Sequence, residues 1–209
     1  MGMLKFETTL KLTLCSLILL APFTGSAASL MCTGDTCNVT AVTPAKALTK
    51  VSEGVRIKKI AFIKVKVYRA ELFTSGGTWK KGEDNLLEKI DGNLPIVLRL
   101  NLLRDIGGAK IEDSFRDALK ANDVDLNSTG IKELMAAVKS TKEIKENETA
   151  SFVGFKKATG EEVVILVGPD GKETETQGSP GFIKNLFSIW FGKPADDQLA
   201  QTKKDLLGL

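Results

Sequence analysis

The chain of 209 residues contains no histidine. This absence excludes Ser-His-Asp and Cys-His nucleophile arrangements, and it excludes zinc or iron sites ligated by histidine. Any general acid–base chemistry must therefore rely on lysine, tyrosine, carboxylates or a positioned water molecule. Cysteine is also scarce, with three residues, so a cysteine-rich metal site is excluded as well. We expect neither a metal nor a cofactor.

The chain also lacks the composition of a nucleic-acid-binding protein. Its formal net charge is +3 and aromatic residues make up 6% of the sequence, whereas such proteins combine a basic surface with stacking aromatics. Hydrophobic residues make up 43%, which suits one buried core and argues against a disordered chain or a multi-span membrane protein. We expect a globular domain without a nucleic acid partner.

The N-terminus has the parts of a secretory signal. Lys5 and Lys11 precede the apolar run Leu12–Leu20, and the small residues Thr24–Ser29 follow it. The run is shorter than the roughly 20 residues that span a bilayer. We therefore predict that residues 1–28 are a signal peptide and that the mature protein is exported, periplasmic or secreted, with no integral membrane span after cleavage. An uncleaved anchor is the alternative interpretation.

Cleavage there leaves Cys32 and Cys37 as the only cysteines of the mature chain. An even pair in an exported protein, closing a tight loop, predicts a disulfide bond. Residues 29–53 around it carry no sustained hydrophobic period. We therefore predict that residues 29–53 form an N-terminal lead-in, a surface segment before the domain, which is cross-linked locally by a disulfide that lies outside the core.

Residues 54–209 read as one domain of mixed structure. Ile57–Val67 is rich in β-branched residues, and Ile63, Val65 and Val67 alternate with Lys64 and Lys66, which predicts a single strand with one solvated face. Leu94–Leu103 predicts another strand. Further predicted elements are a helix after Gly107-Gly108, a helix over 131–138, a strand meander from Phe152 that continues past a turn at 168–171, a helix over Gly181–Phe191 and a last helix capped by Asp196. Strands and helices do not alternate strictly, so the fold class is α+β, a mostly antiparallel sheet with helices on one face.

Three segments, Gly54–Phe73, Leu98–Ile106 and Phe187–Leu209, resemble the chalcone isomerase-like family in its bacterial exported branch. The resemblance implies a large antiparallel sheet with helices layered on one face, an open-faced β-sandwich, with a cleft between them. In the plant isomerases that cleft closes a flavanone ring. Related members without isomerase activity bind fatty acids, with an arginine against the carboxylate.

The resemblance also implies which residues form the site. Arg56 matches the family arginine, and Tyr68 occupies the position of the enzymes' threonine. Ile111 and Ala118 stand where the enzymes have a catalytic tyrosine and an asparagine, and neither can hydrogen-bond an enolate. The resemblance therefore implies ligand binding by Arg56 and Tyr68 rather than chalcone cyclisation. From the residues alone, a surface arginine and a packing tyrosine are the alternatives.

Twelve residues separate Arg56 from Tyr68, which is about 40 Å along a straight strand. The two side chains can share a ligand only if the chain bends or reverses between them. No glycine, proline or asparagine in that stretch signals such a turn.

Three functions fit these observations. The first is an exported, non-catalytic binder of a fatty acid or similar apolar carboxylate in a cleft beside Arg56. The second is an isomerase or intramolecular lyase on an unknown conjugated substrate, with Arg56 as its catalytic residue stabilising oxyanion charge. The third is a cell-envelope interaction or structural domain with a collapsed cleft, for which no cavity above roughly 300 Å³ is expected.

Overall fold

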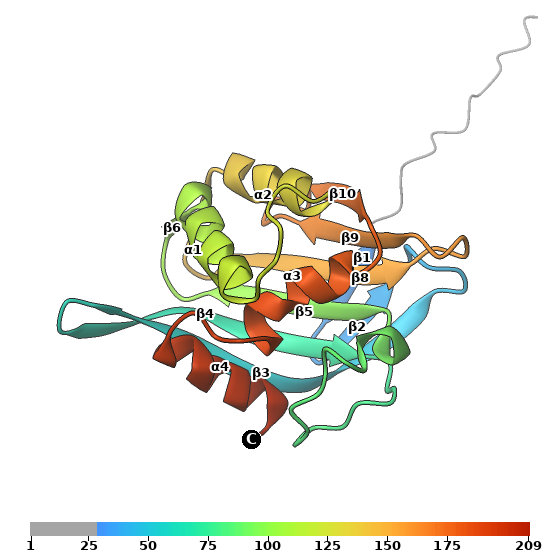
Figure 1. Cartoon of the computed structure of the whole chain (residues 1–209), viewed down its shortest axis with the longest axis horizontal. Coiled ribbons are helices and arrows are strands. Elements are labelled where there is room, and N and C mark those ends of the chain that lie inside the picture. The colour runs from blue at the N-terminus through green and yellow to red at the C-terminus, as the bar shows by residue number, and fades with distance from the viewer. Residues whose placement is uncertain (1–28) are drawn as a thin grey trace, which may run out of the picture.

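The computed structural model describes residues 29–209, so the predicted signal peptide lies outside the described residues (Figure 1). Eight strands form one sheet in the order β1-β2-β3-β4-β5-β8-β9-β10, and every neighbouring pair is antiparallel. They are β1 (Leu30–Thr33), β2 (Thr36–Val39), β3 (Lys46–Ile60), β4 (Ile63–Thr74), β5 (Ile96–Leu102), β8 (Thr149–Lys156), β9 (Glu162–Val167) and β10 (Glu173–Gly178).

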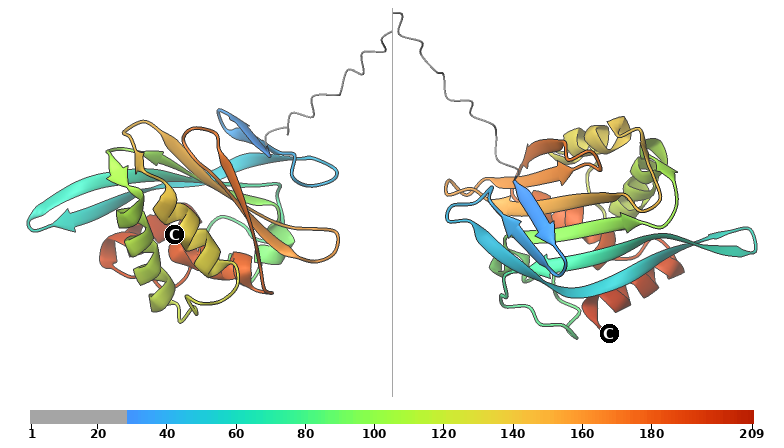
Figure 2. Two further views of the ribbon diagram at one scale, coloured as in Figure 1. Left: turned by 90° about the horizontal axis from the view of Figure 1, so that it is seen from above. Right: turned by 180° about the vertical axis from the view of Figure 1, so that it is seen from behind.

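Four helices lie on one side of this sheet, as Figure 2 shows from above. They are α1 (Gly108–Ala121), α2 (Ile131–Ser140), α3 (Phe182–Phe191) and α4 (Asp197–Leu207). A 3-10 turn, η1 (Ile90–Asn93), precedes β5, and the short strands β6 (Ile106–Gly107) and β7 (Glu143–Ile144) pair beside α1 and α2. The predicted α+β class, with helices on one face of an antiparallel sheet, is confirmed.

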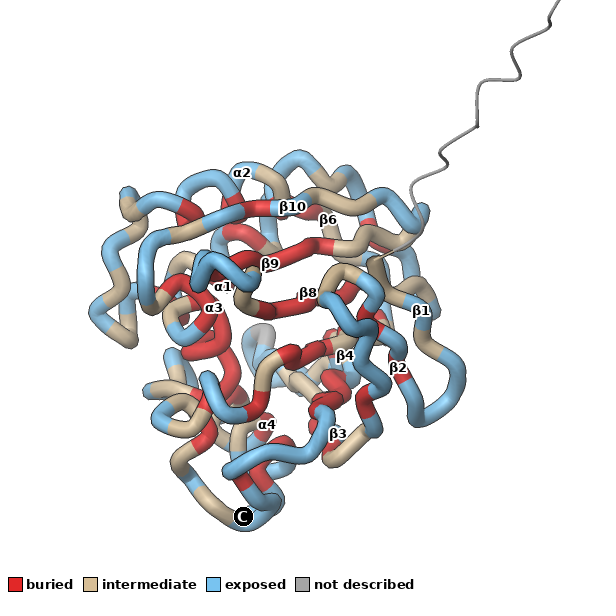
Figure 3. Tube along the Cα trace, turned by 90° about the vertical axis from the view of Figure 1, so that its right-hand side faces the viewer, coloured by how far each residue is buried: buried red, intermediate tan, exposed pale blue. Residues whose placement is uncertain are grey.

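The sheet separates two hydrophobic cores. On its helix-covered face, alternate residues such as Leu72, Leu98 and Phe152 pack against the helices. The intervening residues, such as Phe73 and Val153, pack together on the opposite face. Figure 3 shows that the most buried backbone runs through the central strands and α3. The period-2 alternation of these strands therefore supplies both cores.

The N-terminal segment belongs to the sheet, so a lead-in outside the core is wrong as a structural description of residues 29–53. Strands β1 and β2 form a hairpin that continues into β3, and the Ser29 amide donates a hydrogen bond of 2.6 Å to Glu173 at the far edge strand. The Cys32–Cys37 disulfide is confirmed, but Cys37 is fully buried in the second core. The reason is that alternation along β2 directs Cys37 and Val39 inward.

The predicted single strand over Ile57–Val67 is a hairpin instead. β3 ends at Ile60, Ala61 and Phe62 form the turn, and β4 returns from Ile63. Ala61 has a φ of 53°, a left-handed conformation that glycine or asparagine usually fills. The chain thus reverses without the usual turn residues, and this reversal makes Arg56 and Tyr68 direct cross-strand partners.

Candidate functional site

A pocket of about 510 Å³ lies between α1 and the helix-covered face of the sheet. Its apolar lining comes from the four helices, from six strands and from the segment between α3 and α4, and comprises Val65, Val67, Leu100, Leu102, Ile106, Ile111, Phe115, Ala118, Val138, Ile144, Ala150, Phe152, Leu166, Ile189, Ala195 and Leu199. Arg56, Tyr68 and Asp196 line the same pocket. The structure therefore brings both predicted site residues to one cavity, and its volume lies in the range of ligand sites.

Arg56 is positioned by the packing of α4 on β3. Gly54 allows this approach, because a Cβ there would meet the Thr202 carbonyl oxygen at 2.8 Å. The Thr202 hydroxyl donates a hydrogen bond of 3.2 Å to the Val55 carbonyl one residue before Arg56. Asp196 caps α4 by accepting a hydrogen bond from the Leu199 amide at 2.7 Å. The N-terminus of α4 therefore positions the Asp196 carboxylate beside the Arg56 guanidinium.

The Arg56 guanidinium binds the Asp196 carboxylate through its two terminal nitrogens, Nη1 and Nη2. Nη1 and Nη2 donate to the two carboxylate oxygens of Asp196 at 2.8 and 2.6 Å, and Nη1 also donates to the Ile57 carbonyl at 2.8 Å. A guanidinium has five N–H donors in a planar fork. Two of them, Nε–H and the second Nη2–H, have no acceptor within residues 29–209. These two N–H groups lie along one edge of the plane and match a second carboxylate.

The charges of this pair are partly protected from solvent, since the side chains of Arg56 and Asp196 are 11% and 40% exposed. Partial burial favours a raised pKa for Asp196, but the hydrogen bonds from Arg56 and from the Leu199 amide outweigh it and hold that pKa below its ordinary value. Asp196 is therefore ionised at neutral pH and anchors the guanidinium.

Tyr68 presents a hydroxyl proton with no protein acceptor. Its oxygen accepts a hydrogen bond of 3.0 Å from Trp190 Nε1, and no acceptor for the Tyr68 proton exists in the described part of the chain. Burial raises the pKa of the Tyr68 hydroxyl, while the Trp190 hydrogen bond and the charge of Arg56 oppose that shift only in part. The hydroxyl therefore stays protonated and can donate to a ligand.

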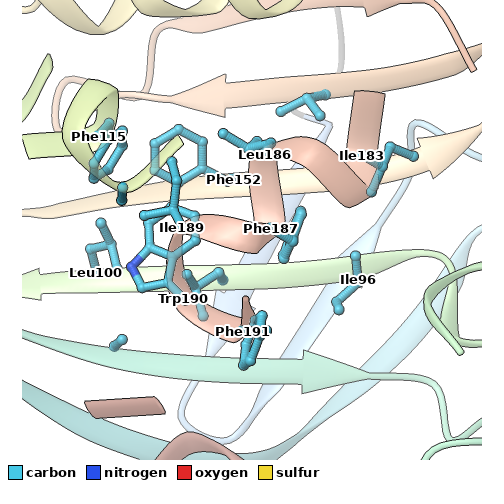
Figure 4. Packing of buried hydrophobic residues seen from close by; sticks show 14 of the residues in the cluster. Ile96, Leu100, Phe115, Phe152, Ile183, Leu186, Phe187, Ile189, Trp190 and Phe191 are labelled. Carbon is cyan, nitrogen blue, oxygen red and sulfur yellow. The ribbon is translucent and has the colours of Figure 1, made fainter. Parts of the chain in front are cut away.

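Trp190 is held in place by an aromatic cluster on the sheet (Figure 4). Its indole lies edge-on to Phe115 of α1, with ring centroids 5.1 Å apart, and 5.5 Å from the ring of Phe152 on β8. Phe115 and Phe152 are in turn 5.7 Å apart. All three side chains are buried. Because aromatic packing fixes the indole, its N–H holds the Tyr68 hydroxyl oxygen at one place in the pocket.

The two α1 positions that the resemblance matches to catalytic residues carry no acid–base group. Ile111 and Ala118 both line the pocket. The two other hydroxyls of the lining donate to backbone carbonyls, Ser114 to Lys110 at 2.9 Å and Thr141 to Ala137 at 3.3 Å. Among the half-buried donors of the described pocket residues, the N–H edge of Arg56 and the O–H of Tyr68 thus have no internal acceptor.

Charged side chains of both signs rim the pocket. They are Lys58, Arg104, Asp105, Lys110, Asp113 and Asp117. Asp105 accepts a hydrogen bond from the Glu146 amide at 2.8 Å, which lowers the pKa of its carboxyl group. Lys58, Arg104 and Lys110 form no ion pair within residues 29–209. Arg104, which follows β5, is exposed and lines the pocket.

Sequence reasoning missed two functional relationships. Asp196 was predicted only as a helix cap, yet it is also the partner of Arg56, 140 positions away in the sequence. Trp190 lies in the predicted helix Gly181–Phe191, but that prediction does not show that its N–H positions Tyr68. No local pattern carries either relationship. Among residues 29–209, no cluster of acidic or cysteine side chains is arranged for a metal ion, and no helix is both long and apolar enough to cross a bilayer.

Comparison with known proteins finds a matching family model and a similar solved structure. The family model described as chalcone isomerase-like matches residues 31–208, so the match includes β1 and β2. Among solved structures, the chain is similar to the crystal structure of a fatty-acid binding protein of Arabidopsis thaliana. That alignment has 16% sequence identity and a TM-score of 0.49, and it covers 77% of this chain and 86% of that chain. No curated protein sequence matches.

Proposed function

The chain belongs to the chalcone isomerase-like family, and we propose that it binds a fatty acid or similar apolar carboxylate without converting it. The observation that carries this proposal is the coincidence of an apolar pocket with donors that lack an acceptor. Arg56 and Tyr68 both line the cavity of about 510 Å³, and among the described residues the Nε–H and second Nη2–H of Arg56 and the O–H of Tyr68 have no acceptor.

In the proposed complex the ligand carboxylate accepts from both N–H groups of this edge. Asp196 keeps the guanidinium in place from its other end. The Tyr68 hydroxyl donates a further hydrogen bond. Hydrogen bonds to charged groups contribute about 1.5–3 kcal/mol each, and an arginine fork recognises a carboxylate through its planar geometry. The apolar lining then covers the hydrocarbon part of the ligand.

The isomerase alternative has less support in this pocket. Arg56 and Tyr68 could stabilise a developing oxyanion, but the α1 wall contributes Ile111 and Ala118 to the cavity. Neither side chain can transfer a proton or orient water. Turnover of a conjugated phenolic substrate that disappears in Arg56→Met would favour this alternative. The cavity also argues against a structural domain with a collapsed cleft.

Export is part of the proposal. The Cys32–Cys37 disulfide, of which Cys37 is fully buried, suits an oxidising compartment, and the composition of residues 1–28 suits a secretory signal. We therefore place the protein in the periplasm or outside the cell. Detection of mature protein beginning near residue 29 in the periplasmic or extracellular fraction tests this part of the proposal.

The ligand class is tested by comparing a long-chain fatty acid with its methyl ester, which keeps the hydrocarbon chain but has no charge. Equilibrium binding is measured by displacement of a fluorescent fatty acid. The wild-type protein is expected to bind the acid about tenfold or more tightly than the ester, because the uncharged ester cannot form the charge-assisted hydrogen bonds with the Arg56 guanidinium. Arg56→Met is expected to lose this preference while still binding the ester.

Arg99→Met is the matched control, since Arg99 lies outside the pocket lining. It should keep the preference for the acid in whatever fraction of the protein folds. Equal binding of acid and ester by the wild-type protein would overturn the proposal, and so would an unchanged preference in Arg56→Met.

A further inference from the structure

The tip of the β3–β4 hairpin extends past the rest of the sheet, and all views show it clear of the helices (Figures 1 and 2). At its end, Phe62 is 97% exposed and Ile63 is 67% exposed. The other large exposed hydrophobic side chains of the described chain, Met31 and Leu209, lie elsewhere. An aromatic side chain at the end of a projecting hairpin has no packing role within the chain.

The same tip is strongly basic. The stretch Ile57–Lys66 contains four lysines and no acidic residue. These lysines are exposed and form no ion pair within residues 29–209; they are Lys58, Lys59, Lys64 and Lys66. Lys59 and Lys64 are direct cross-strand partners, and like charges in that position destabilise a hairpin. The arrangement is therefore slightly unfavourable in the isolated protein, and an anionic partner would relieve the repulsion.

The two faces of the hairpin differ. Lys59, Lys64 and Lys66 share one face, because Lys59 pairs with Lys64 and side chains alternate along β4. The opposite face carries Ile63 and Val65, with Lys58 as the cross-strand partner of Val65. Lys58 and Val65 also line the pocket. The apolar face of the hairpin is thus continuous with the wall of the pocket.

We infer that this hairpin tip docks on the surface of an anionic lipid bilayer. Phe62 and Ile63 enter the boundary between headgroups and acyl chains, and the lysines contact lipid phosphates. A bilayer supplies both partners at once, negative charge over the width of the hairpin and an apolar layer beneath it. On the basis of the proposed function, the pocket then opens beside the membrane, which is the source of its carboxylate ligand.

The inference is tested by flotation of the full chain with vesicles, using mixed phosphatidylcholine–phosphatidylglycerol vesicles and pure phosphatidylcholine vesicles. All variants keep residues 1–28, so any contribution of that segment is constant. The protein is expected to float with the anionic vesicles, and binding is expected to fall as salt rises. The triple substitution Lys59→Gln, Lys64→Gln and Lys66→Gln is expected to weaken vesicle binding about a hundredfold. Loss of each lysine near an anionic membrane surface lowers the affinity about fivefold, and three such losses multiply.

Two variants control for charge and apolar exposure. The triple substitution Lys120→Gln, Lys132→Gln and Lys139→Gln removes the same charge from exposed positions of α1 and α2, and we expect no comparable loss. Phe62→Ser is expected to weaken vesicle binding about tenfold, whereas Met31→Ser removes an exposed hydrophobic side chain from β1 and should have no effect.

Equal flotation of the tip variants and their controls would overturn the inference. It would also be overturned if light scattering showed that the tip mediates self-association in solution, lost in Phe62→Ser, without vesicle binding. Failure of vesicle binding is distinguishable from failure of the proposed function, because the comparison of acid and ester is made without vesicles. Conversely, Arg56→Met should lose the preference for the acid and keep its vesicle binding.

Discussion

Two arginine–carboxylate pairs lie in different regions of this molecule, and their surroundings differ. Arg99 on β5 donates from Nε to Glu71 at 2.7 Å and from Nη2 to the Gly34 carbonyl at 3.0 Å, and its guanidinium lies 4.7 Å from the Phe73 ring centroid. Asn101 donates a further hydrogen bond of 2.6 Å to Glu71. The Arg56–Asp196 pair, in contrast, borders a cavity.

The difference indicates which pair is structural and which is available for a ligand. Glu71 is 8% exposed, and its carboxylate receives Arg99 and Asn101, with the Lys50 ammonium 3.5 Å away. No part of that cluster lines the pocket. Arg56 keeps one edge of its guanidinium free, and Tyr68 beside it keeps its proton free. Unused donors at a cavity, rather than the presence of an ion pair, therefore identify the candidate site.

The largest effect on stability is expected for Glu71→Gln. This change leaves the Arg99 guanidinium without its buried counter-charge, and removing one partner of such a pair costs about 3 kcal/mol of unfolding free energy. Urea unfolding monitored by fluorescence measures it. Glu175→Gln is the matched control, because its pair with Lys157 is exposed and should contribute less than about 1 kcal/mol. Equal costs in the two variants would contradict the structural role of Glu71.

A smaller effect is expected for Tyr68→Phe, which leaves Trp190 Nε1 without its acceptor. The loss of that buried hydrogen bond should cost about 1–2 kcal/mol of unfolding free energy. Affinity for a long-chain acid should also fall about threefold to tenfold, because the ligand loses one neutral donor. Displacement of a fluorescent fatty acid measures it, with the methyl ester as the comparison. An unchanged affinity for the acid would show that the hydroxyl does not contact the ligand.

Asp196→Asn separates the two roles of Asp196. Asparagine is as good a helix cap as aspartate, so we expect the unfolding free energy to change by less than about 1 kcal/mol. Without the competing negative charge, Arg56 should bind a ligand carboxylate about threefold more tightly. Calorimetric titration with a fatty acid measures this. Weaker binding in Asp196→Asn would contradict this prediction and would show that the anchoring of the guanidinium by Asp196 outweighs the competition from its charge.

The smallest effect is a difference in pH dependence. Hydrogen bonds from Arg99 and Asn101 hold the pKa of Glu71 below its ordinary value, although burial opposes them. Its contribution to stability is therefore complete above the unfolded-state pKa of about 4.3 and is lost as the pH falls through the folded-state pKa. Unfolding free energies measured below about pH 5 should fall less steeply in Glu71→Gln than in the wild-type protein. Parallel curves would contradict the assignment.

Periodicity predicted the elements that bury one face. Alternating leucines placed β5, and the stripe from Ile111 to Leu119 placed α1. The hairpin turn at Ala61 and Phe62 was not predictable, because its left-handed residue is an alanine and the turn lies within the unbroken apolar run Ile60–Ile63. The approach of Arg56 to Asp196 depends on the packing of α4 against β3, which no local pattern encodes.

The central claim is that Arg56 receives a ligand carboxylate. The most direct measurement follows the ¹³C signal of a carboxyl-labelled long-chain fatty acid bound to the full chain while the pH is varied. In the wild-type protein the bound carboxyl group should titrate at a lower pH than in Arg56→Met, because a neighbouring guanidinium favours the ionised form. Identical titration in the two proteins, or no saturable bound signal in the wild-type protein, would contradict the account.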